Sequence, residues 1–198
     1  MRLSLATRIG LSVLSGIGVG FIRTNDSIVE VLGEGPAFYG LSGALFAAGV
    51  LFPYLKRNDR LFIRAFALVI VSGASYHAAV WLALEGPFAG PDGWISFTIA
   101  SIAGAAIVMT AFILATPARV SHAYVFSGLA AGLIGGPITY VTLPEDTILV
   151  LSGHAGWHML ICLAIYIGTR NRGRTENSPE ISVRPHMWLL SPYDDDTL

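Results

Sequence analysis

The chain has 198 residues, of which 54% are hydrophobic and 13% are charged, and its formal net charge is -1. Soluble domains carry roughly twice that charged share, at about 25%. The mean hydropathy of +0.64 leaves too few polar side chains to cover a surface in water. These values exclude a soluble protein and predict a chain that lies in a lipid bilayer. The sequence has no basic cluster with interleaved aromatic residues, so nucleic acid is excluded as a partner.

Apolar stretches predict the fold class. Crossing the hydrocarbon layer takes about 20 helical residues, and turn-forming residues separate the stretches that approach this length. We therefore predict an all-α polytopic membrane helix bundle of about six transmembrane helices within residues 1–168. A polar tail over 169–198 follows, for which the composition predicts disorder. The predicted spans are residues 5–22, 37–55, 61–84, 95–116, 119–141 and 147–168.

Basic residues predict the orientation. With six spans, the lysines and arginines at the loops and helix ends fall on one side, and Arg23 is the exception. Because loops rich in lysine and arginine stay in the cytoplasm, both termini are predicted to be cytoplasmic.

Glycines predict close helix packing. Gly16 and Gly20, and the series Gly128, Gly132 and Gly136, repeat at four-residue spacing on one helical face. Small residues at this spacing let neighbouring backbones approach closely. Packing inside the bundle is the favoured interpretation, and an oligomer formed through the second series is the alternative.

Histidines are the candidate site residues, because ionisable groups inside a membrane are costly and mark function. His154 and His158 are four residues apart, which places them on one face of the last helix. At about 1.5 Å per residue, His77 and His154 each lie roughly 10 Å below the same end of the bundle. His122 lies at the opposite end. Taken singly, each is more simply a hydrogen-bonded core histidine.

Three neutral imidazoles at one depth suit a catalytic zinc ion, which keeps a fourth position for water. We therefore predict that His77, His154 and His158 hold zinc, without His122 and His186. Asp92 begins the fourth span and is the predicted catalytic residue, because a carboxylate can accept a proton from metal-bound water. The alternative role for this aspartate is to complement the helix dipole.

The run Gly153-His154-Ala155-Gly156-Trp157-His158 resembles the H-A-x-W-H motif on the last helix of alkaline ceramidases. These enzymes belong to a membrane hydrolase superfamily that includes the progestin and adipoQ receptors. The resemblance implies that the two histidines of this run bind zinc together with an early histidine, matched by His77, beside an aspartate, matched by Asp92. It predicts a zinc-dependent hydrolase that acts on a lipid amide or ester.

Two other functions stay open. Haem b held between His77 and His154 would satisfy a bis-histidine geometry. A non-catalytic membrane scaffold or small transporter would need the histidines only as core residues. Membrane lipids are the expected partners in each case, and a lipid is the substrate in the hydrolase.

The topology leads to a labelling prediction. Cysteines introduced separately at Gly90 and at Asn171 should react with a membrane-impermeant thiol reagent from opposite sides of the membrane, because an odd number of crossings separates the two positions. Reaction of both cysteines from one side would contradict the six-span count.

Overall fold

The structure is a computed structural model that describes residues 3–33, 35–55, 60–89, 93–116, 121–142 and 146–170. Across these ranges the chain is helical, and six helical segments are long and apolar enough to cross a membrane. The predicted all-α bundle with six candidate spans is therefore confirmed. The six are α1 (Leu5–Thr24), α3 with its continuation (Pro36–Tyr54), α4 (Leu61–Leu84), α5 (Gly93–Ala115), α6 (His122–Val141) and α7 (Thr147–Arg170).

Several span ends differ from the predicted ones, by up to three residues, and one short helix is additional. A short helix, α2 (Asp26–Leu32), follows α1. The Asn25 side chain caps its start by accepting a hydrogen bond from the Ile28 backbone N–H. Gly33 ends the helix with a φ of 64°. At the other end of the chain, α7 continues past residue 168 to Arg170. The predicted tail beyond residue 170 lies outside the described residues.

The second span changes its helical geometry along its length. The α-helix α3 (Pro36–Phe46) is followed by a π-helical turn, η1 (Ala47–Leu51), and a 3₁₀ turn, η2 (Phe52–Tyr54). Pro53 has no backbone N–H and its ring crowds the preceding turn, which accounts for the loss of regular α-helix here.

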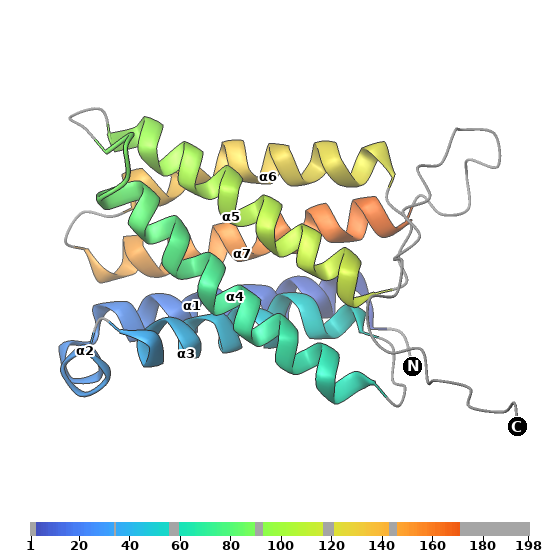
Figure 1. Cartoon of the computed structure of the whole chain (residues 1–198), viewed down its shortest axis with the longest axis horizontal. Helices are drawn as coiled ribbons and strands as arrows, with labels where there is room; N and C mark the ends of the chain where they lie inside the picture. The colour runs from blue at the N-terminus through green and yellow to red at the C-terminus, as the bar shows by residue number, and fades with distance from the viewer. Residues whose placement is uncertain are drawn as a thin grey trace, which may run out of the picture.

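The spanning helices form a closed ring. α1 packs against α7, α7 against α6, α6 against α5, α5 against α4 and α4 against α3, while α3 and η1 return to α1 (Figure 1). α1 begins and α7 ends at the same end of the bundle. We call the opposite end, where α1 and α4 end and α7 begins, the outer end, following the predicted orientation.

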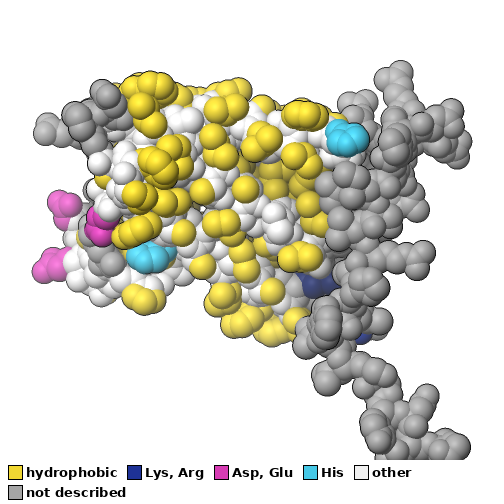
Figure 2. Space-filling model, turned by 45° about the horizontal axis from the view of Figure 1, so that its top comes forward, with side chains coloured by type: hydrophobic (Ala, Val, Ile, Leu, Met, Phe, Trp, Pro, Cys, Tyr) yellow, Lys and Arg dark blue, Asp and Glu magenta, His cyan; other side chains and the backbone are white. Residues whose placement is uncertain are grey.

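Charge separates along the bundle axis. Figure 2 shows apolar side chains over the middle of one face, acidic side chains towards one end and basic side chains towards the other. The exposed large apolar side chains include Phe62, Phe66 and Leu114, at 82%, 60% and 70% exposure. This surface suits a multi-pass integral membrane protein, since such side chains are stable against lipid.

Glycines set the closest helix contacts. A Cβ atom at Gly20 would lie 2.9 Å from the Leu151 Cα on α7, and one at Gly132 would lie 2.7 Å from the Ile102 Cα on α5. α5 likewise covers Gly128 and Gly136. α5 therefore packs on the glycine face of α6. From the sequence, a second copy of the chain was the alternative neighbour for this face.

The α1–α7 contact yields a stability prediction. A Cβ atom at Gly16 would lie 2.5 Å from the Ala155 Cα, whereas a Cβ atom at Gly10 would meet nothing within 4 Å. Gly16→Ala should therefore destabilise the protein by about 1–3 kcal/mol through overpacking. Gly10→Ala should be neutral or stabilise it by up to about 1 kcal/mol through helix propensity. Thermal unfolding in detergent, followed by circular dichroism, compares the two. Equal midpoints would contradict the close backbone contact.

Candidate functional site

His158 lies at the centre of the bundle with no exposed surface. Its Nδ1 is 2.8 Å from the Ser15 Oγ on α1, and this hydroxyl is also 3.0 Å from the Ser12 carbonyl oxygen. A serine hydroxyl has one proton, so while it donates to the Ser12 carbonyl, the imidazole Nδ1–H donates to Ser15. The Phe46 ring packs edge-on at a centroid distance of 4.8 Å. Within the described chain the His158 Nε2 has no hydrogen-bond partner.

His154 lies one helical turn nearer the outer end and borders a cavity inside the ring. Its side chain is 7% exposed, and its ring centroid is 6.1 Å from that of Tyr76 on α4. No described residue forms a hydrogen bond with its imidazole. The cavity has a volume of about 80 Å³ and is lined from all six spanning helices by Arg23, Phe46, Ser72, Ser75, Tyr76, Ala79, Val80, Ala83, Leu84, Phe97, Ala100, Ser101, Gly104, Val108, Thr139, His154 and Trp157.

The charged and ring-bearing polar groups of this cavity come from α1, α4 and α7. Arg23, in the last turn of α1, places its Nη1 3.5 Å from the Tyr76 hydroxyl, to which it donates. Two other polar groups are already engaged: the Ser75 hydroxyl donates to the Gly104 carbonyl at 3.2 Å, and the Trp157 indole N–H donates to a serine hydroxyl on α5 at 2.8 Å. Much of the remaining lining is apolar, such as Ala79 and Val80 on α4 and Val108 on α5.

His77 lies on a different side of α4. Its side chain is exposed, and its ring centroid is 4.5 Å from that of Tyr39 on α3. Tyr39 in turn lies 6.0 Å from Tyr76, whose ring is the one that approaches His154. Two tyrosine rings thus lie between the histidines that were predicted to converge.

The predicted zinc ligands are therefore not brought together. His154 and His158 share one face of α7, as predicted, but His77 points away from them. Among the described residues, no group of three histidine, cysteine or acidic side chains could hold a metal ion. Haem b between His77 and His154 stays a prediction from the sequence. The depth estimate for His77 was insufficient, because depth does not say which side of α4 a residue occupies.

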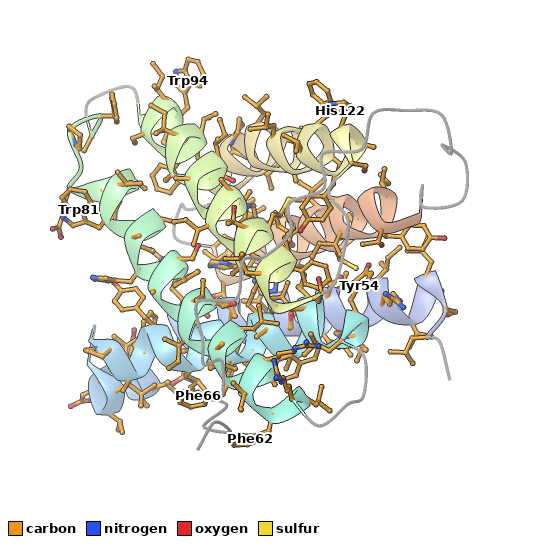
Figure 3. All side chains as sticks on the ribbon, turned by 45° about the vertical axis from the view of Figure 1, so that its right-hand side comes forward. Tyr54, Phe62, Phe66, Trp81, Trp94 and His122 are labelled. Carbon is orange, nitrogen blue, oxygen red and sulfur yellow. The ribbon has the colours of Figure 1, made fainter. Side chains whose placement is uncertain are left out.

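Of the remaining predicted residues, the structure describes His122 alone. His122 is exposed at the start of α6, at the end of the bundle opposite the outer end (Figure 3). Asp92, the predicted catalytic residue, and His186 lie outside the described residues.

Ser15 and Arg23 were not predicted as residues of the site. A signal for Arg23 was present, because it departs from the distribution of the other basic residues. Ser15 carried no comparable signal, since serines at small-residue helix contacts are common.

Comparison of the chain with protein-family models, curated proteins and solved structures gives no match. The resemblance to alkaline ceramidases stays a prediction from the run that contains His154 and His158.

The buried Ser15–His158 bond yields a second stability prediction. Ser15→Ala should destabilise the protein by about 1–3 kcal/mol, because the imidazole Nδ1 loses its partner in a site closed to water. Ser152→Ala is the matched control: this exposed hydroxyl bonds only the Ile148 carbonyl one turn earlier, so its loss should cost less than about 0.5 kcal/mol. Thermal unfolding in detergent measures both variants. Equal effects would contradict a structural role for the Ser15–His158 bond.

Proposed function

We propose that this protein binds a single-chain lipid with an anionic oxygen head group, of the fatty-acid class, in the cavity between its spanning helices. The observation that carries the proposal is His154, which is 7% exposed, borders the cavity and lacks a hydrogen-bond partner in the described chain. Buried polar groups nearly always have a partner. A head-group oxygen in the cavity would supply one.

The charge and hydrogen-bonding groups support an anionic head group. Arg23 brings a guanidinium to the cavity wall that also carries His154, and a guanidinium matches the geometry of a carboxylate. The Tyr76 hydroxyl, which accepts from Arg23, keeps its own proton for a second acceptor. These three side chains come from three different helices, so the folded bundle determines their spacing.

The apolar wall supports a narrow tail. Ala79, Val80 and Ala83 on α4 and Ala100 and Val108 on α5 supply the apolar part of the cavity lining. A volume of about 80 Å³ exceeds the roughly 10–15 Å³ that one water needs by the same measure. A wall of this kind with a few placed polar groups is typical of small-molecule sites.

Zinc-dependent hydrolysis of a lipid amide or ester stays a prediction from the sequence. It requires a third metal ligand beside His154 and His158, and a base such as Asp92. Lipid binding requires only the cavity and the unpartnered imidazole of His154. Binding is therefore the function that the geometry supports better.

The binding proposal predicts saturable quenching of Trp157, which borders the cavity. A variant that retains Trp157 as its one tryptophan, made by replacing Trp81, Trp94 and Trp188 with phenylalanine, is titrated in detergent with tail-brominated stearic acid. Adding His154→Leu should weaken binding by at least about fivefold, the equivalent of one lost hydrogen bond.

The matched control is His122→Leu, the same substitution at an exposed histidine outside the cavity, and it should leave the affinity unchanged. Quenching without saturation, or equal affinity in His154→Leu, would overturn the binding proposal. Stoichiometric zinc in the purified protein, with release of fatty acid from ceramide, would support the hydrolase prediction instead.

A further inference from the structure

A groove on the outside of the bundle runs between α3 and α4, on the other side of α4 from the central cavity. It has a volume of about 350 Å³. The residues that line it are Gly35, Pro36, Tyr39 and Gly40 from the α3 side, and Val69, Ile70, Gly73, Ala74 and His77 from α4.

Glycines form its floor. Gly73 meets α3 closely, since a Cβ atom there would lie 3.1 Å from the Tyr39 carbonyl oxygen. Gly40 is the opposite case: a Cβ atom at this position would meet nothing within 4 Å. The two helices thus touch at Gly73, and the space beside Gly40 is open enough for another molecule to lie against the backbone.

His77 provides the polar group of the groove. Its ring lies tilted against that of Tyr39, and in the part of the chain that the structure describes it forms no hydrogen bond. Tyr39 lies in the first turn of α3, which begins at Pro36, so this pair sits near the outer end of the second span. A polar side chain exposed on a membrane-facing helix is costly unless it reaches the polar layer of the bilayer.

The groove continues the surface that faces lipid. Ile70 lines it and is 56% exposed, and Phe66 and Phe62, one and two turns earlier on α4, project outward from the bundle (Figure 3). In a chain with six candidate spans, the molecules in contact with this surface are the lipids of the bilayer. No protein partner is needed to fill the groove.

We propose that the α3–α4 groove binds one phospholipid of the outer leaflet. One acyl chain lies over Gly40 and Gly73, and the His77 imidazole donates a hydrogen bond to an oxygen of the phosphate–glycerol region. The glycine floor lets the chain approach the backbone of both helices. This site is independent of the proposed central cavity, because α4 lies between the two.

Photo-crosslinking tests the site. The protein is placed in nanodiscs of phosphatidylethanolamine and phosphatidylglycerol that contain a small fraction of phosphatidylethanolamine with a diazirine in one acyl chain. Crosslinked peptides are identified by mass spectrometry. Labelling should concentrate on residues 69–77, and His77→Leu should reduce it by at least about fivefold, as expected for one lost hydrogen bond.

A matched pair of substitutions separates the groove from the general lipid surface. Gly40→Leu fills the groove, and Gly10→Leu places the same side chain at a glycine of α1 whose Cβ position is equally open. Labelling of residues 69–77 should fall in the Gly40 variant and persist in the Gly10 variant. Equal labelling in both variants, or crosslinks between two copies of the chain at the groove, would overturn the proposal.

The same variant distinguishes the two lipid sites. Gly40→Leu leaves the residues around Trp157 untouched, so saturable quenching by brominated stearic acid should be unchanged while groove labelling is lost. Loss of both signals in Gly40→Leu would contradict the independence of the groove.

Discussion

The absence of a side chain at Gly16 lets α1 lie directly against the α7 backbone, and the buried centre of the bundle depends on this contact. A Cβ atom there would approach the His154 carbonyl oxygen to 2.6 Å. At this separation the neighbouring Ser15 reaches His158, with 2.8 Å between hydroxyl and imidazole. The π-helical turn η1 packs onto the same serine through Gly49. A larger residue in place of Gly16 would separate the serine from its histidine and move η1.

The cavity exists because the ring is not tightly packed all the way round. Glycines bring α1 close to α7 and α6 close to α5, whereas small side chains of α4 and α5, such as Ala79 and Ala100, face the interior without filling it. Most hydroxyl groups in the bundle are satisfied by a backbone carbonyl of their own helix, as Thr139 is by Gly135 at 2.8 Å. His154, which borders the cavity, has no hydrogen bond to a described residue.

Two neighbouring residues of α4 lie in different surroundings. Tyr76 borders the internal cavity and His77 lies in the external groove. Adjacent helical residues are rotated by about 100° from each other but differ in depth by only about 1.5 Å. A depth comparison thus treats these two residues as equivalent, although one faces the protein interior and the other faces the bilayer.

The fold class and the shared face of His154 and His158 follow from local rules. A membrane span needs about 20 apolar residues, and residues four apart on a helix always share a side. The orientation of His77 depends instead on which side of α4 turns inward. In a soluble helix the hydrophobic stripe would indicate that side, but lipid is as apolar as a protein core and removes the contrast. Only packing against the neighbouring helices decides it, so the three histidines could match in depth and still not meet.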